Sequence, residues 1–423
     1  MVKKGYKQTE VGIIPNTWQV ISLQNLCVQN GIVRGPFGGA LKKEIFVAEG
    51  YKVYEQGNAI YKTVTRGSYY IDAAKYNKML RFSVREGDFI VSCSGTIGMI
   101  FQIPINAPKG IINQALLKLT INDAVVNPQY FYLYFSCDSF TRRIVDDTQG
   151  GAMKNLVGMD VFRNTPFPIP PMPEQKNISI VLADITDLIT NLEAIIAKKK
   201  AIKQGTMQEL LTGKRRLPGF FGEWRYFNLM KNSKVKARIG WQGLKKSEYL
   251  DSGYALLVTG TDFDDGRVLW DGCHYVTRSR YEQDRNIQLQ NNDILITKDG
   301  SLGKAALVQG LTKPATLNSG IFVIRPLQDA YDPVFVYQIL SSFVFKNFLD
   351  RLSAGSTIIH LYQKDVGKFE FLLPPTIAEQ KAIAEALSEM DADIAALENK
   401  LTKYRQVKQG MMQQLLTGKI RLV

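Results

Sequence analysis

Two stretches of the chain carry hydrophobic residues at the spacing of a long amphipathic helix. In the first, apolar residues fall three and four positions apart: Ile178, Val181, Leu182, Ile185, Leu188, Ile189, Leu192, Ile195, Ile196 and Ile202. In the second they follow the seven-residue repeat of a coiled-coil seam: Ile383, Leu387, Met390, Ile394, Leu397, Leu401, Tyr404, Val407, Met411 and Leu415. At ~1.5 Å per residue, each helix is predicted to be ~55–60 Å long.

Short strands, glycine turns and prolines are predicted before each helix. Strand-like runs at 88–91 and 293–296 lead into glycine-containing turns at 94–98 and 299–303. Prolines at 166–173 and 374–375 disfavour helix and strand pairing, so an extended, stiff connector is expected before each helix.

These patterns belong to one repeat with a shift of 205 residues. Glu174-Gln175-Lys176 recurs as Glu379-Gln380-Lys381, and the Leu-Leu-Thr-Gly-Lys ending at 210–214 recurs at 415–419. The same shift relates Asp88 to Asp293, Asn113 to Asn318, Pro128 to Pro333, Leu156 to Leu361, and Asp160 to Asp365. The sequence predicts an α+β protein in four parts: a globular part at 1–166, a connector and helix at 167–215, a second globular part at 216–373, and a second connector and helix at 374–423.

The order of charges along the two helices predicts how they pair. Each helix carries its acidic residues early and its basic residues late, for example Asp184 before Lys203 and Asp391 before Lys408. An antiparallel pair sets each acidic half against a basic half, and a parallel pair does not. We therefore predict an antiparallel two-helix coiled coil, with the two globular parts at opposite ends and related by a pseudo-twofold axis. A helical hairpin used merely as a spacer is the alternative.

Composition narrows the class of partner. The 423 residues carry 53 Lys and Arg against 39 Asp and Glu, a net charge of +14 that favours an anionic partner such as nucleic acid. The four cysteines are widely separated, which predicts neither a disulfide framework nor a zinc site. With no long uncharged apolar segment and no secretory signal, we expect a cytoplasmic protein that does not span a membrane.

Three short motifs raise the question of catalysis. Asn127-Pro128-Gln129-Tyr130 resembles the Asn-Pro-Pro-Tyr signature of amino-methyltransferases, but it and its repeat at Asp332 also fit helix N-caps followed by proline. The 299–304 segment lacks the spacing of a phosphate loop. No pair of carboxylates with a lysine stands out as a nuclease site, and the chain has just two histidines, so we predict neither catalytic residues nor a bound metal.

Basic residues interleaved with tyrosines point instead to DNA binding. A glycine turn also lets backbone approach a phosphate, and His360 is interpreted as a polar contact. The predicted DNA-binding residues are Arg34, Lys42, Lys43, Arg66, Gly95, Thr96, Arg278, Arg280, Lys298, Ser301, Lys304 and His360. For any single residue a solvated surface position remains the alternative, and for the glycine segments a plain turn.

The whole chain resembles the specificity subunits of type I restriction–modification systems (the HsdS family). The resemblance rests on three features, each present twice. They are the openings from Tyr6 to Trp18 and from Arg216 to Trp224, the prolines before each Glu-Gln-Lys, and the two Leu-Leu-Thr-Gly-Lys endings.

This resemblance implies two target recognition domains that read an asymmetric, two-part target in double-stranded DNA. It implies a non-catalytic chain that assembles with two modification subunits and, for cleavage, with restriction subunits. S-adenosylmethionine, ATP and magnesium would belong to those partners, and this chain would hold no cofactor. The rival interpretations are a DNA-binding enzyme with its own methyltransferase or nuclease activity, and a coiled-coil scaffold without DNA specificity.

Overall fold

The computed structural model describes residues 3–146, 155–353 and 360–423. Contacts divide the chain into two compact units, residues 1–192 with 400–423 (unit 1) and residues 193–399 (unit 2). Each unit contains one globular part together with half of helix α6 (Met172–Leu210) and half of helix α11 (Ile377–Leu415). None of the helices in the described part of the chain has the length and apolar composition needed to cross a bilayer.

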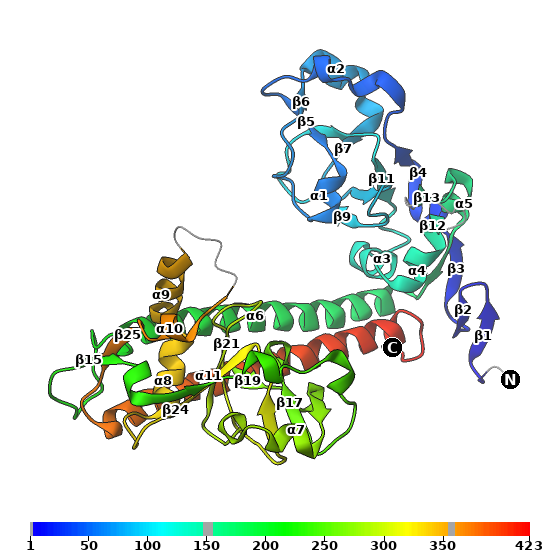
Figure 1. Ribbon diagram of the computed structural model, residues 1–423. Coiled ribbons are helices and arrows are strands. Elements are labelled where there is room, and N and C mark those ends of the chain that lie inside the picture. The colour runs from blue at the N-terminus through cyan, green and yellow to red at the C-terminus, as the bar shows by residue number, and fades with distance from the viewer. Residues whose placement is uncertain (1–2, 147–154, 354–359) are drawn as a thin grey trace. The chain divides into compact units, whose positions relative to one another are not determined.

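Unit 1 is built on two four-stranded sheets and several short helices, whose arrangement can be followed in Figure 1. The first sheet has the order β4 (Cys27–Arg34), β11 (Leu116–Ile121), β8 (Phe89–Ser92), β9 (Ile100–Gln102). The second has the order β6 (Tyr70–Ile71), β5 (Tyr51–Tyr54), β10 (Gly110–Ile112), β7 (Ser83–Val84). Strand pairs β1 (Tyr6–Thr9) with β2 (Gly12–Pro15), β3 (Gln19–Ser22) with β14 (Pro166–Ile169), and β12 (Val145–Asp146) with β13 (Asn155–Leu156) complete it. The short helices are α1 (Gln56–Ile60), α2 (Ala73–Lys78), α3 (Pro128–Phe135), α4 (Asp138–Ile144) and α5 (Met159–Asn164).

Unit 2 repeats this plan. Its larger sheet has the order β16 (Ser233–Lys236), β24 (Ile321–Pro326), β21 (Ile294–Thr297), β22 (Ala305–Leu307), β19 (Arg267–Val268), β18 (Phe263–Asp264). A three-stranded sheet has the order β20 (His274–Val276), β17 (Ala255–Val258), β23 (Ala315–Leu317), and β15 (Arg225–Asn228) pairs with β25 (Glu370–Leu373). The short helices are α7 (Arg278–Glu282), α8 (Pro333–Leu340), α9 (Phe343–Ser353) and α10 (Gln363–Val366).

The predicted repeat is confirmed for four consecutive strands and the two short helices that follow them. The starts of β8, β9, β10, β11, α3 and α4 lie 205 residues before those of β21, β22, β23, β24, α8 and α9. Pairing directions also agree, because β5 and β10 are parallel in unit 1 as β17 and β23 are in unit 2. Asp88 and its counterpart Asp293 are both buried. Each carboxylate accepts a hydrogen bond from the backbone amide of the residue three positions before it, Arg85 or Gln290, and this bond holds the turn that leads into β8 or β21.

The helices α6 and α11 pack antiparallel, as the charge order predicted. In unit 2 the basic end of α6 meets the acidic start of α11, with Lys199 Nζ 2.9 Å from Asp393 Oδ2 and Lys200 Nζ 2.6 Å from Glu398 Oε1. In unit 1 the start of α6 meets the C-terminal residues, where Asn177 Nδ2 donates to the Leu422 carbonyl at 3.0 Å.

Two details of the predicted pattern were wrong. Pro166–Ile169 is not a bare connector but the strand β14, which pairs antiparallel with β3. Prolines are tolerated there because the sheet has two strands, and an edge strand does not need every N–H for pairing. On α6, three of the ten apolar residues assigned to the hydrophobic stripe are exposed to solvent: Leu188 (43%), Ile195 (48%) and Ile202 (50%). They are seven residues apart and therefore share one face of the helix, away from its buried stripe.

A buried glutamate at the start of each long helix ties the unit together. In unit 1, Glu174 accepts from Trp18 Nε1 at 3.0 Å and forms a two-point ion pair with Arg421, at 2.6 and 2.8 Å. In unit 2, Glu379 accepts from Trp224 Nε1 at 3.3 Å and pairs with Arg216 at 2.8 and 2.6 Å. Each ion pair therefore joins the start of one long helix to the segment that follows the other.

The turn after each long helix depends on glycine. Gly418 has φ +69°, and an added Cβ would lie 2.4 Å from Pro15 Cδ and 3.3 Å from the Trp18 ring. Gly213 has φ +71°, and its added Cβ would lie 3.2 Å from the Trp224 ring. Glycine in both Leu-Leu-Thr-Gly-Lys endings thus lets the chain turn closely against the tryptophan.

We predict that Arg421→Met destabilises the protein by about 3–5 kcal/mol, because it leaves the Glu174 carboxylate, 2% exposed, buried without its counter-charge. Removing both charges, in Glu174→Gln with Arg421→Met, should cost less than the single change. Urea denaturation followed by circular dichroism measures this.

The matched control is Arg163→Met, which removes an exposed arginine paired with Asp160 and should cost less than about 1 kcal/mol. Equal costs for Arg163→Met and Arg421→Met would contradict a stabilising role for the buried pair.

Candidate nucleic-acid interface

The glycine turn after β8 is reproduced after β21 with the same hydrogen bonds. In unit 1, Ser92 Oγ donates to the Thr96 carbonyl at 2.5 Å and accepts from the Met99 amide at 3.0 Å. In unit 2, Thr297 Oγ1 donates to the Ser301 carbonyl and accepts from the Lys304 amide at 2.9 Å. The buried hydroxyl at the end of each strand therefore holds the turn in shape.

The two glycines of each turn have different roles. Gly98 and Gly303 have positive φ and lie against α4 and α9, where an added Cβ at Gly303 would be 2.2 Å from Leu349 Cδ1. Gly95 and Gly300 also have positive φ, but nothing lies within 4 Å of an added Cβ. The turn is therefore anchored on one side and presents Gly95 with Thr96, or Gly300 with Ser301, to solvent. The predicted strand–turn–strand geometry is confirmed.

In unit 1, Arg34 lies next to this turn. It is the last residue of β4 and stands opposite Leu117, which in turn stands opposite Val91 of β8. Burial raises the pKa of the Cys93 thiol to about 11, while the neighbouring Arg34 guanidinium lowers it. Arg34, Gly95 and Thr96 are thus brought together at one edge of the sheet.

In unit 2, four predicted residues meet at the corresponding edge. The Lys298 carbonyl accepts from the Leu361 amide at 2.9 Å, and His360 Nδ1 pairs with Asp299 Oδ1. Lys298 Nζ lies 5.5 Å from the centre of the Phe322 ring. Ser301 is exposed at the tip, whereas Lys304 Nζ donates back to the Phe263 carbonyl. The Asp299–His360 pair has no counterpart residues in unit 1, because Ser94 and Asn155 occupy those repeat positions.

The remaining predicted residues lie elsewhere in their units. Lys42 and Lys43 are exposed on the segment between β4 and β5. In the loop after α1, Arg66 stacks on Tyr61, with its guanidinium carbon 3.9 Å from the centre of the ring. On α7, Arg278 Nε is 2.7 Å from Glu282 and Arg280 Nε is 2.6 Å from Glu248. Both α7 arginines are therefore already paired with carboxylates of the protein.

The methyltransferase-like motif is a helix cap. Asn127 Oδ1 accepts from the amides of Gln129 and Tyr130 at 3.1 and 3.0 Å, and Asp332 Oδ1 accepts from the Phe335 amide at 2.8 Å. Tyr130 is fully buried, with its hydroxyl donating to the Pro168 carbonyl at 3.0 Å, and burial raises its pKa well above the ordinary value. These residues are committed to the fold and do not form an open pocket.

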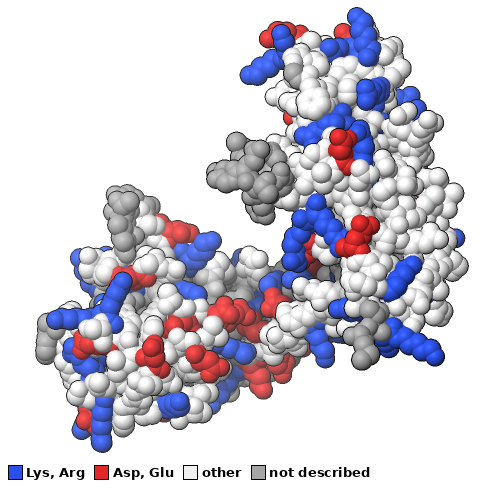
Figure 2. Space-filling view, turned by 90° about the vertical axis from the view of Figure 1, so that its right-hand side faces the viewer, with Lys and Arg blue, Asp and Glu red and all other residues white. Residues whose placement is uncertain are grey.

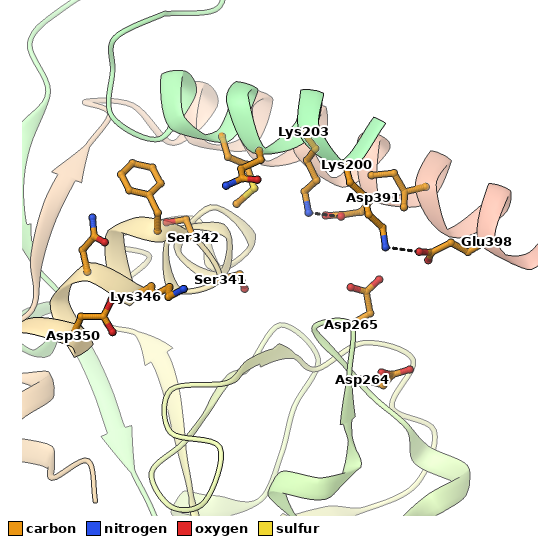
Figure 3. A pocket seen from close by; sticks show the side chains of 15 residues that line it. Lys200, Lys203, Asp264, Asp265, Ser341, Ser342, Lys346, Asp350, Asp391 and Glu398 are labelled. Atoms are coloured by element: carbon orange, nitrogen blue, oxygen red, sulfur yellow. Dashed lines mark hydrogen bonds and ion pairs between the residues drawn. The ribbon is translucent and has the colours of Figure 1, made fainter. Parts of the chain in front are cut away.

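A charged cavity lies where the α8–α9 corner faces the long helices of unit 2 (Figure 3). It has a volume of about 910 Å³, and five carboxylates and three lysines line it: Asp264, Asp265, Asp350, Asp391, Glu398, Lys200, Lys203 and Lys346. Lys203 pairs with Asp391 and Lys200 with Glu398 across the helix pair. The hydrogen bond that Lys200 donates to the Glu398 carboxylate raises the pKa of Lys200.

The matching cavity in unit 1 lies at the α3–α4 corner and is basic. It has a volume of about 630 Å³ and is lined by four cationic side chains, Arg142, Arg405, Lys408 and Lys419, against one carboxylate, Asp138. Burial lowers the pKa of Lys408, and the positive charge of nearby Lys62 lowers it further. Lys62 has a φ of +51° and donates to the Tyr132 hydroxyl at 2.5 Å.

The sequence did not single out two lysines near the basic cavity of unit 1. Lys62 is one of many basic residues interleaved with tyrosines, and Lys408 entered the sequence analysis as one of the basic residues late in the second long helix. The 205-residue register links Lys408 to Lys203 but does not indicate which of them has a carboxylate partner.

Figure 2 shows one face of the molecule, on which Lys and Arg side chains form small groups, several beside Asp or Glu, with no continuous basic patch. Within the described ranges, no cluster of three or more His, Cys, Asp or Glu could hold a metal ion.

Comparisons with known proteins agree with this architecture. The family model for the type I restriction modification DNA specificity domain matches residues 15–204 and 242–408. The chain is 24% identical over 356 residues to the MjaVIII specificity subunit of Methanocaldococcus jannaschii, covering 80% of each chain. It is 22% identical over 338 residues to the EcoBI specificity subunit of Escherichia coli, covering 73% of this chain and 69% of that one.

Solved structures share the fold. The S subunit of a type I restriction–modification system from M. genitalium matches with a TM-score of 0.56 at 15% identity, covering 94% of this chain and 96% of that one. The HsdS subunit from Thermoanaerobacter tengcongensis matches with a TM-score of 0.51 at 17% identity, covering 99% and 100%. With both copies of the repeat matched by the family model, the chain belongs to the type I restriction–modification DNA specificity subunits, a family that is non-catalytic within its complex.

Proposed function

We propose that the chain reads an asymmetric, two-part target in double-stranded DNA, with one half-site read by each globular part. The repeated turn carries this proposal: both units present an anchored glycine turn, at positions 205 residues apart, next to different side chains. Backbone at an exposed glycine approaches phosphate closely, while the side chains around it can contact base edges. The same turn beside different side chains is what a reader of two unequal half-sites needs.

The twelve predicted DNA-binding residues fall into three groups under this proposal. Arg34, Gly95 and Thr96 in unit 1, with Lys298, Ser301 and His360 in unit 2, surround the turns and are proposed to contact the half-sites. Lys42, Lys43, Arg66 and Lys304 are proposed to contribute phosphate contacts or positive potential. Arg278 and Arg280 are already paired with glutamates, so DNA would have to compete with those carboxylates.

Both long helices carry the same exposed surface, which we propose as the contact for two modification subunits. Ile202 and Gly205 on α6 recur as Val407 and Gly410 on α11, and neither glycine has an atom within 4 Å of an added Cβ. A glycine inside a helix costs about 1 kcal/mol relative to alanine. Since none of the residues that the structure describes comes close enough to require glycine there, close approach of a partner backbone supplies the reason. Restriction subunits are proposed to join through that complex.

Genome-wide methylation mapping is the test of the overall function. Cells carrying this gene with its modification gene should methylate adenine within one two-part sequence, and cells lacking this gene should not. An unchanged methylation pattern would contradict the proposed role. Methylation by the purified chain alone with S-adenosylmethionine would instead support an enzyme.

We predict that His360→Ala changes recognition in one half-site only. Loss of a hydrogen bond to a base edge should reduce discrimination at that position by about 1–3 kcal/mol. Methylation mapping should then give a motif that is relaxed in one half and unchanged in the other. An unchanged motif, or a loss spread over both halves, would contradict base reading by His360.

We predict that a longer α6 lengthens the unread spacer of the target. Inserting four residues after Ala197 adds about 6 Å of helix. Methylation mapping of that variant should show a longer spacer between unchanged half-sites. The control replaces four residues at the same place without changing the length, and it should keep the original spacer. An unchanged spacer in the insertion variant would contradict a ruler role for α6.

We predict that Gly205→Leu with Gly410→Leu prevents assembly without unfolding the chain. Leucine is the better helix former, so thermal stability should be kept or raised, while its side chain occupies the space proposed for the partner. Size-exclusion chromatography with the modification subunit measures assembly. Gln204→Leu with Gln409→Leu, which adds the same side chains on the cavity side, should still assemble. Normal assembly of the glycine variant would contradict this contact surface.

A further inference from the structure

The two corner cavities have the same origin but different charge. The lining residues that the long helices supply correspond through the repeat: Lys200, Lys203, Gln204 and Met207 of α6 match Arg405, Lys408, Gln409 and Met412 of α11. In unit 2 acidic side chains outnumber basic ones around the cavity, whereas in unit 1 one aspartate faces four cationic residues. The duplicated helix ends therefore lie in opposite electrostatic surroundings.

Lys408 shows most clearly how the charge around the two cavities differs. Its repeat counterpart Lys203 forms an ion pair with Asp391, seen in Figure 3. The position that corresponds to Asp391 in unit 1 is Thr186, whose hydroxyl donates to the Leu182 carbonyl at 2.6 Å. Among the residues that the structure describes, no carboxylate pairs with Lys408, which is nevertheless partly buried.

A second lysine adds to the unbalanced charge. Lys62, in the loop between α1 and β6, is close enough for its charge to act on Lys408. Its backbone adopts a left-handed conformation that side-chain-bearing residues rarely take, and its ammonium group is held by the Tyr132 hydroxyl. Two lysine ammonium groups that lie close enough to disfavour each other's charge, with no carboxylate paired with either in the described ranges, are stabilised by a bound anion.

We infer that Lys62 and Lys408, beside the cavity lined by Arg142 and Lys419, form a binding site for phosphates of the DNA backbone. This inference rests on the proposed function. It assigns sequence-independent anchoring of the DNA to unit 1, where one lysine comes from the globular part and the other from the duplicated helix. In unit 2 the equivalent lysine is neutralised by Asp391 and makes no such contact.

Backbone phosphate fits this site better than a carboxylate of a partner protein. Lys62 belongs to the same loop as Arg66, and both side chains are exposed. Arg66 stacks on Tyr61, which is itself 59% exposed, so its charge lies at the surface, where phosphates of the DNA backbone can reach it. A docking site for a modification subunit should instead occur in both units, because two copies of that partner are expected. The excess of positive charge occurs at the cavity of unit 1 alone of the two corner cavities.

The test measures DNA affinity against salt concentration for the complex of the full chain with its modification subunits. Each lost phosphate contact makes the slope of log K against log [salt] shallower by about 0.9. Lys62→Gln with Lys408→Gln should therefore reduce the slope by about 1–2 and leave the methylated sequence unchanged. Lys408→Arg keeps the charge and should retain the wild-type slope.

Lys203→Gln is the matched control, because it removes the same residue of the repeat from an ion pair, and it should leave the slope unchanged. Equal slopes for the wild type and the double glutamine variant would overturn this inference. Loss of subunit assembly by that variant would also overturn it, in favour of an acidic protein partner. A wild-type complex that shows no salt-dependent, sequence-specific binding would contradict the proposed function itself.

Discussion

The structure depends, in each unit, on a buried glutamate at the start of a long helix. Glu174 and Glu379 stand at the start of the long helices, where burial of a carboxylate is unfavourable unless hydrogen bonds and a counter-charge compensate for it. A tryptophan N–H and a two-point arginine contact supply both. Because each arginine follows the other long helix, neither unit is complete without a segment distant in sequence. The same contacts fix where each helix begins and the direction in which its partner returns.

A second buried side chain strengthens this junction in both copies. Gln175 Oε1 accepts from the Asn127 amide at 2.7 Å, and its amide group donates to the Pro170 carbonyl at 2.9 Å. Gln380 makes the same two bonds, to the Asp332 amide at 2.8 Å and the Pro374 carbonyl at 3.1 Å. The Glu-Gln pair of the repeat therefore ties the start of the long helix to the cap of a short helix and to the proline that directly follows β14 or β25. This explains in physical terms why the motif occurs twice.

The surfaces around this shared frame differ between the copies. The glycine turn is held by the same hydroxyl geometry in both units, yet an aspartate–histidine pair stands beside it in one and an arginine in the other. The duplicated lysine of the helix end is neutralised by Asp391 in unit 2 and lies near Lys62 in unit 1. A frame kept by buried hydrogen bonds allows exposed neighbours to differ, because exposed side chains contribute little to stability.

The sequence by itself determined the duplication, the two long helices, their antiparallel direction and the helix caps at Asn127 and Asp332. These features follow from the spacing of residues along the chain and from the order of their charges. Both can be read without knowing which distant residues come into contact. Tertiary structure alone decided that Pro166–Ile169 pairs as a strand and that Leu188, Ile195 and Ile202 face solvent. It also decided that Lys203 pairs with Asp391, whereas Lys408 has no ion pair within the part of the chain that the structure describes. Each of these outcomes depends on which residues from remote parts of the chain come within contact distance, and the order of residues does not state that.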